Sequence, residues 1–457
     1  MKPLLSRKFS TPILGAVVTL WLGIAQALSQ DATTETIIKE GKANNRVMEH
    51  SEYLCNKIGP RLTGSDKLMR ASEWAVAQFK KFGCAKVYLE EYGTIAVGFN
   101  RGHQIGKALI GGKSSTLTCT TLAWSAGTNR PVTARAVIAP TNEADLHREK
   151  LKGAWVLLAT VPDNQTQLNR LIAAIHAAGA AGVVRASRED LMRMSGNYRI
   201  TWENRPTRPE IFVMNSQFAK LVSAVKAGQD VQLTFDMRNE FKKGPIKLYN
   251  VIAEIPGTEK PDECVIVGGH IDSWDLASGA TDNSTGVATT MEAARILCAV
   301  GAKPKRTIRF ILWSGEEQGL LGSIGWVRKH KAELPKISAV FVHDWGTNYI
   351  SGLAATPALM PPLEKVFAPL ITLDPQMKFT LRETATIPRA PSDNMPYLSA
   401  QVPAFLWSQS GRVNYSFAHH TQHDHYDRIV PEYQKHSALV VALAAWGVAN
   451  LDKQLPR

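Results

Sequence analysis

Uninterrupted apolar runs mark the second half of the chain. Four such runs occupy residues 264–268, 307–313, 339–342 and 403–407. Stretches with helical periodicity lie at 286–298, 319–330, 359–370 and 432–451. Short continuous apolar runs are typical of strands buried on both faces, as in a parallel sheet covered by helices. The pattern therefore predicts an α/β fold, doubly wound around a mostly parallel sheet.

The first half alternates between the two periodicities. Residues 36–82 are mostly helical in pattern, and a strand follows at 86–91. Between about 110 and 240, predicted strands lie at 134–139, 154–159, 182–186 and 231–235, with helices at 168–178 and 218–226. This series contains no cluster of ligand or nucleophile side chains. We expect an inserted α/β subdomain at 110–240, which separates the catalytic domain into residues 30–109 and 241–457.

The first 29 residues have the pattern of a secretory signal peptide. Lys2, Arg7 and Lys8 precede an apolar stretch at 13–25, and Ala25-Gln26-Ala27 is an A-x-A cleavage site. The alternative is a membrane anchor, but a span needs about 20 apolar residues and this run is shorter. No later segment reaches that length. We expect a secreted or periplasmic protein without a membrane segment in its mature form.

Composition and charge narrow the class of protein. Hydrophobic residues make up 44% of the chain and charged residues 20%, which excludes a disordered, collagen-like or coiled-coil protein. The formal net charge is +13, yet the basic residues are scattered singly or in pairs. No basic run or nucleic-acid-binding motif is present, so a nucleic-acid partner is not expected.

The chain has five cysteines, too few and too scattered for a disulfide framework. The odd number leaves at least one thiol free. Cys264 and Cys298 lie in apolar runs and are expected to be small core residues. Pairing of Cys55 with Cys84 in an oxidising compartment remains open.

Histidine, aspartate and glutamate side chains, which are able to bind metal ions or transfer protons, follow the predicted strands of the second half of the chain. In parallel sheets these side chains gather at the carboxyl edge, where ligands bind. Each one has a structural explanation when taken singly, and His343 is expected to be structural. Together, however, the carboxylates would repel or become protonated unless metal ions balanced them, and His with carboxylate ligands suits zinc. The candidates are His270, Asp272, Asp282, Glu316, Glu317, Asp344, His419, His420 and Asp424.

These motifs resemble those of the co-catalytic zinc exopeptidases. The matching segments are GGHIDSWD, GATDN, WSGEEQG, HDWG and HHTQHD, in this order, and the similarity runs from about residue 51 to the C-terminus. The insert at 110–240 resembles a protease-associated domain. The resemblance implies the zinc exopeptidase fold and two zinc ions per chain.

The resemblance also implies a role for each matched residue. His270 and Asp344 would bind one zinc, Glu317 and His420 the other, and Asp282 would bridge them. Asp272 would accept the second ring N–H of His270. The peptide bond between Asp282 and Asn283 would be cis, and Asp424 would steady the loop that carries His420.

Glu316 is the remaining carboxylate, and it suits a general base. Two zinc ions lower the pKa of a bridging water to about 7, and Glu316 would take its proton and return it to the leaving amine. Many relatives have Tyr where this chain has His419, so His419 or Tyr415 is the candidate that polarises the scissile carbonyl. A structural role for His419 is equally open.

Several functions compete on this pattern. A catalytically inactive receptor-like relative, a one-zinc acyl transferase or a binding module with a vestigial site would all be expected to lack part of the ligand set, which is intact here. The peptide substrate is expected to be a dipeptide or short peptide, and a broader aminopeptidase is the alternative. The stretch 376–414, with Lys378, Glu383, Arg389 and Arg412, is expected to wall the pocket. A homodimer remains open.

Overall fold

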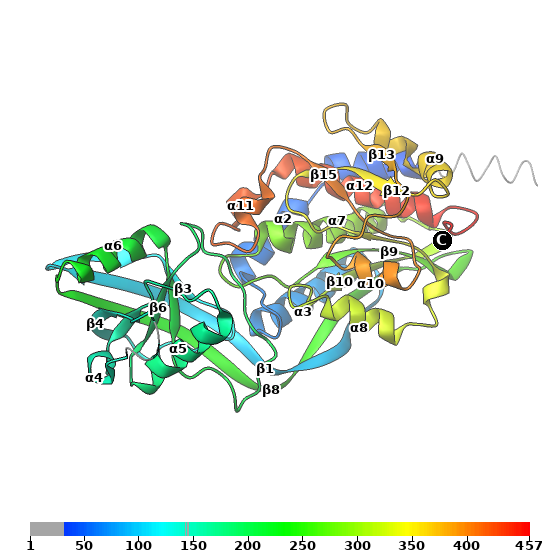
Figure 1. Ribbon diagram of the computed structural model, residues 1–457. Helices are drawn as coiled ribbons and strands as arrows, with labels where there is room; N and C mark the ends of the chain where they lie inside the picture. Colours follow the sequence, from blue (N-terminus) through cyan, green and yellow to red (C-terminus); the bar gives the residue numbers. More distant parts are fainter. Residues whose placement is uncertain (1–31, 142, 144–145) are drawn as a thin grey trace, which may run out of the picture.

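The computed structural model describes residues 32–141, 143 and 146–457. The predicted signal peptide at 1–29 lies outside these residues. Within the described residues, no helix combines the length and apolar character that a membrane crossing requires. The chain forms two lobes, a larger body and a smaller lobe, joined by two very long strands (Figure 1). These strands are β1 (Ala85–Ile110) and β8 (Val231–Ile255).

The body contains the predicted mostly parallel sheet. Its strands are β9 (Lys260–His270), β10 (Arg306–Trp313), β11 (Ile337–Val342) and β14 (Ala404–Leu406). They are parallel in the order β14-β11-β9-β10, and β8 pairs antiparallel with β10. Because the four parallel strands end at one edge, the polar residues after them are brought together there.

Helices cover both faces of this sheet, as the apolar runs predict. Val265 and Val267 of β9 face one core with α3 (Asp66–Phe82), α7 (Thr285–Ala299) and α12 (Pro431–Ala449). Their neighbours Cys264 and Ile266 face the other core, which includes residues of α8 (Leu321–Lys329) and α10 (Asn394–Ser399). A strand enclosed on both faces has no solvent side, so its sequence does not alternate.

The smaller lobe continues the same hydrogen-bonded sheet. β4 (Val132–Ile138) pairs with β8, and β5 (Trp155–Leu157), β6 (Gly182–Ala186) and β7 (Glu210–Val213) follow in parallel. α5 (Gln165–Ala177) and α6 (Asn215–Lys226) contribute to cores on opposite faces.

β1 is far longer than the strand predicted at 86–91. It pairs with β8 from Ala85, opposite Glu254, to Ile110, opposite Val231. Bulges interrupt the register at several points, and such bulges let long paired strands bend and twist. The two strands therefore carry the sheet from the body into the smaller lobe without a linker.

Candidate active site

The predicted ligands meet at the carboxyl edge of the body sheet. His270 ends β9, Glu317 follows β10, and Asp344 follows β11. Asp282 lies in the turn Ala280–Ser284 that leads into α7, and its peptide bond to Asn283 is cis, as predicted. After β10 the chain turns at Gly315, where φ is 74°, a conformation that favours glycine.

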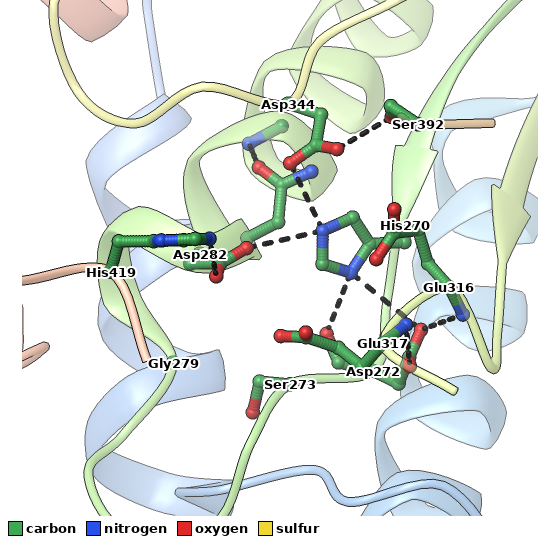
Figure 2. A network of polar contacts seen from close by, with 12 residues as sticks. His270, Asp272, Ser273, Gly279, Asp282, Glu316, Glu317, Asp344, Ser392 and His419 are labelled. Carbon is green, nitrogen blue, oxygen red and sulfur yellow. Dashed lines mark hydrogen bonds and ion pairs between the residues drawn. The ribbon is translucent and has the colours of Figure 1, made fainter. Parts of the chain in front are cut away.

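Asp282 lies between two histidines. Its Oδ1 is 3.2 Å from Nε2 of His270, and its Oδ2 is 3.2 Å from Nε2 of His420. Each histidine has a second carboxylate partner: Asp344 Oδ1 is 3.1 Å from His270 Nε2, and Glu317 Oε2 is 2.9 Å from His420 Nε2. Figure 2 shows the contacts of His270 with Asp282 and Asp344. The five side chains thus form two groups that share Asp282.

The tautomer of His270 follows from its second ring nitrogen. Nδ1 lies 3.0 Å from the backbone carbonyl of Asp272, and a carbonyl can only accept, so Nδ1 carries a proton. Nε2, which faces Asp282 and Asp344, is the nitrogen that would be left to bind a metal ion. The Asp272 carboxylate, predicted to accept this proton, is farther away at 3.6 Å. It accepts instead from the backbone N–H groups of Glu316 and Glu317, each at 3.3 Å. Asp272 therefore also orients the turn that presents both glutamates.

Asp424 joins the His420 loop to the Asp282 turn. Its Oδ1 accepts from the backbone N–H and the hydroxyl of Thr281, at 2.6 and 2.7 Å, and its Oδ2 accepts from the N–H of Asp282 at 3.2 Å. Burial raises the pKa of Asp424 to about 7.

The donor set fits divalent metal ions. Burial raises the pKa of Glu316 well above its usual range, and burial next to Asp282 raises that of Glu317 to about 7. Oε1 of Glu317 is buried and has no hydrogen-bond donor among the described residues. The groups His270–Asp282–Asp344 and Asp282–His419–His420 each place three ligand atoms within 4.8 Å of one another. Several buried carboxylates with few positively charged partners form a favourable site for cations. A ligand set that combines histidine nitrogens with carboxylate oxygens suits zinc.

His419 lies at the solvent side of this cluster. Its Nε2 is 3.7 Å from Asp282 Oδ2, and its ring packs on that of His420 with 3.7 Å between centroids. The ring of Tyr415 is 4.9 Å from that of His419. Both predicted carbonyl-polarising candidates therefore face the same space. His343 is different: it is buried, its ring nitrogens have no partner among the described residues, and burial lowers its pKa to about 4.

A cavity of about 530 Å³ opens directly on these side chains. Its walls include Glu316, Trp345 and Pro391. They also include His419 and four of the five predicted ligands, namely Asp282, Glu317, Asp344 and His420. No Lys or Arg is among the described residues that line it. Without bound cations, the reactive end of the cavity is therefore acidic.

The four charged residues expected to wall the pocket do not line it, and that prediction is wrong. Arg412 pairs with Glu432 at 2.9 Å, and Arg389 donates to Ser399 at 3.1 Å. Lys378 and Glu383 are exposed to solvent. Of the predicted stretch, the cavity is lined by Pro391, because the chain approaches the site only where it enters α10.

Two residues near the site had no recognisable sequence signal. Ser392 donates to Asp344 Oδ2 at 2.5 Å and so fixes that carboxylate (Figure 2). Arg61 is fully buried, and its guanidinium donates to the carbonyls of Ile271, Ser278 and Gly279 at 2.8–2.9 Å. Arg61 therefore shapes the loop between His270 and Asp282. Both residues lie far from the motifs along the chain.

The smaller lobe also contacts the His420 loop. The N–H of Met194 donates to the carbonyl of His420 at 2.7 Å, and the N–H of Met192 donates to Oε1 of Gln422 at 2.8 Å. The guanidinium of Arg193 donates to the carbonyls of His419 and Ser416, at 3.0 and 3.2 Å. Part of the smaller lobe therefore supports the active site.

Known proteins share both the sequence and the fold. Residues 250–445 match peptidase family M28. Carboxypeptidase Q of Xenopus laevis is 28% identical over 91% of this chain and 88% of its own, and human carboxypeptidase Q is 26% identical over the same shares. The crystal structure of a peptidase M28 precursor from Shewanella amazonensis has a TM-score of 0.67 and 26% identity, covering 94% of this chain and 99% of that one. A zinc aminopeptidase from Bacillus subtilis shares the fold, with a TM-score of 0.57 and 20% identity over 87% and 93% of the two chains.

The fold, the site and these relatives define a metallo-exopeptidase. More particularly, residues 250–445 match peptidase family M28, and the chain is similar over most of its length to carboxypeptidase Q.

Proposed function

We propose that this protein is a secreted or periplasmic di-zinc exopeptidase that hydrolyses dipeptides and short peptides. The observation that carries the proposal is the position of Asp282, with one carboxylate oxygen toward His270 and the other toward His420. One carboxylate shared by two groups of ligands is the arrangement that a pair of ions requires.

Each chemical role belongs to a side chain that lines the site. His270 and Asp344 would hold one zinc, Glu317 and His420 the other, with Asp282 between them. When bound, the two ions acidify water and polarise the scissile carbonyl. Glu316 lies beside the ligands and lines the cavity, so it takes the proton from the attacking water and returns it to the leaving amine. His419 and Tyr415 also line the cavity, so either of them is in a position to polarise the scissile carbonyl.

The lack of basic side chains in the cavity walls favours substrates recognised by a free amino terminus over substrates recognised by a free carboxylate. The carboxylates in its described walls are the zinc ligands and the general base of this proposal, so the two ions would balance their charge. No Lys or Arg among the described residues lines the cavity to bind a substrate carboxylate, and this lack of a basic side chain carries the preference. A protonated α-amino group is therefore the better match, whether on a dipeptide or on a longer peptide. This observation also favours the second candidate, a broader aminopeptidase.

A peptide library with modified ends tests both candidates. We expect N-acetylation to abolish hydrolysis and C-terminal amidation to leave it largely intact, as followed by mass spectrometry. If dipeptides are the only members of the library that are hydrolysed, the protein is a dipeptidase. If longer peptides are shortened one residue at a time from the amino end, it is a broader aminopeptidase. Hydrolysis of N-acetylated but not of amidated peptides would contradict amino-terminal recognition.

Secretion has its own test. The motif at residues 1–29 supports export, with cleavage near Ala27 or Ser29. We expect the full chain, expressed in a bacterium, to accumulate outside the cytoplasm with a new amino terminus at this point, as read by mass spectrometry of the intact protein. A chain that stays uncleaved in the cytoplasm would contradict the proposed export.

A further inference from the structure

Two cysteines that are far apart along the chain lie side by side in the structure. Sγ of Cys84 is 3.5 Å from Sγ of Cys298, although 214 positions separate them. Cys84 lies between α3 and β1, and Cys298 lies in the last turn of α7. Both are partly accessible and pack at the edge of the main core of the body. The structure thus brings two thiols into contact at a point that an external reagent is able to reach.

The other three cysteines have different surroundings. Cys55 is buried, and its Sγ contacts Oγ of Ser284 at 3.1 Å, so the pairing of Cys55 with Cys84 considered from the sequence is not what the structure favours. Cys264 is buried in β9, and Cys119 lies in the smaller lobe, within β3 (Cys119–Thr121). The expectation that Cys298 is only a small core residue is therefore incomplete.

We propose that Cys84 and Cys298 form a disulfide bond once the protein meets an oxidising environment. The contact between the two sulfurs carries this inference, since their separation of 3.5 Å is only about 1.5 Å longer than an S–S bond. The hydrogen bond from Cys84 also lowers the pKa of Cys298, which makes Cys298 the better thiolate.

The oxidant is a disulfide carrier, either a small disulfide such as oxidised glutathione or a thiol–disulfide oxidoreductase. The Cys298 thiolate attacks one sulfur of the carrier, forms a mixed disulfide and releases one carrier thiolate. Cys84 then loses its proton and attacks the sulfur of Cys298, which releases the second carrier thiolate. Two protein thiols are oxidised by two electrons, and the carrier disulfide is reduced to two thiols.

The bond would join the end of α3 to the end of α7. The enclosed segment contains β1, the smaller lobe, β8, β9, His270 and Asp282. A cross-link across so long a segment restricts the unfolded chain, and in the chain-entropy account this stabilises the folded state. The inference does not depend on the peptidase reaction, so its failure would leave the proposed function standing.

Thiol counting on the full chain tests the inference. The protein is incubated with oxidised glutathione, dialysed, unfolded and alkylated. We expect three of the five cysteines to be alkylated, a Cys84–Cys298 cross-linked peptide in the digest, and a melting temperature several degrees above that of the reduced protein. Reduction should return the melting temperature to its starting value.

Matched variants separate this pair from the other cysteines. Cys84→Ser and Cys298→Ala should both abolish the cross-link and the oxidant-dependent rise in melting temperature, so either one serves if the other fails to fold. The Cys119→Ser variant should retain both the cross-link and the oxidant-dependent rise in melting temperature. Five alkylated cysteines after oxidation, stable glutathione adducts on Cys84 or Cys298, or a cross-link to Cys55 would overturn the proposal.

Discussion

Met194 donates a 2.7 Å backbone hydrogen bond to the carbonyl of His420, which ties the smaller lobe to a predicted metal ligand. His420 has a φ of 60°, an uncommon conformation for a residue with a side chain, so neighbouring contacts must hold it. Arg193 adds two hydrogen bonds to carbonyls of the same loop. The smaller lobe therefore has a positioning role at the site.

The first prediction concerns Arg193. Arg193→Ala removes the side-chain hydrogen bonds to the carbonyls of His419 and Ser416, and we expect zinc affinity and kcat each to fall by about tenfold, because charge-assisted hydrogen bonds contribute about 1.5–3 kcal/mol. Competition with a chelator measures the affinity independently of activity. Arg188→Ala, at an exposed position nearby in the chain, is the control and should match wild type. Unchanged zinc affinity in Arg193→Ala would show that backbone contacts alone hold the loop.

The second prediction concerns the shared carboxylate. We expect purified protein to hold close to two zinc ions, and Asp282→Ala to lose most of both, because Asp282 faces both histidines. Asp344→Ala should weaken one ion only. Metal analysis after dialysis measures the content. Equal losses in the two variants would argue against a bridging role for Asp282.

The third prediction separates the two adjacent glutamates. Glu316→Gln keeps the size of the side chain but removes the proton acceptor, so zinc content should stay near wild type while kcat falls by about 10²–10⁴. Glu317→Gln should lower zinc content, since a neutral amide is a poorer ligand, and added zinc should partly restore activity. Metal loss in Glu316→Gln alone would reverse the two assignments.

The fourth prediction concerns the pH dependence of the metal-free protein. Burial raises the pKa of both Glu317 and Asp424 to about 7, above the values near 4 expected for the unfolded chain. The folded state then binds more protons between about pH 4 and 7, so the free energy of unfolding should fall as pH rises through this window. We expect a loss of about 3 kcal/mol for each of the two carboxyls, and therefore of about 6 kcal/mol in total, between pH 4.5 and 8.

Urea unfolding of chelator-treated protein at both pH values measures this loss. Metal-free Glu317→Gln is the matched control and should lose less stability, because one of the two titrating carboxyls is absent. Zinc-loaded wild type should also lose less, since the bound ions favour the ionised carboxylates. Equal stability of the metal-free wild type at the two pH values would contradict the prediction.

Local sequence determined the class of fold and the candidate ligands. Apolar runs such as 264–268 have no polar side because both faces of β9 are covered, and this pattern is visible without coordinates. The parallel order of such strands brings their carboxyl ends to one edge, which is why His270 and Asp344 were both candidates. Only the resemblance to the zinc exopeptidases indicated which of these ligands would bind each of the two zinc ions.

Contacts between distant segments were decided only by the tertiary structure. Arg61, Arg193 and Ser392 act through carbonyls or carboxylates that lie far from them along the chain, and such contacts leave no periodic or spaced pattern. The same holds for Cys84 and Cys298, whose contact depends on how α3 and α7 pack. Periodicity reports which face of a segment is buried, whereas the partner of each side chain depends on packing between segments that the sequence alone does not place.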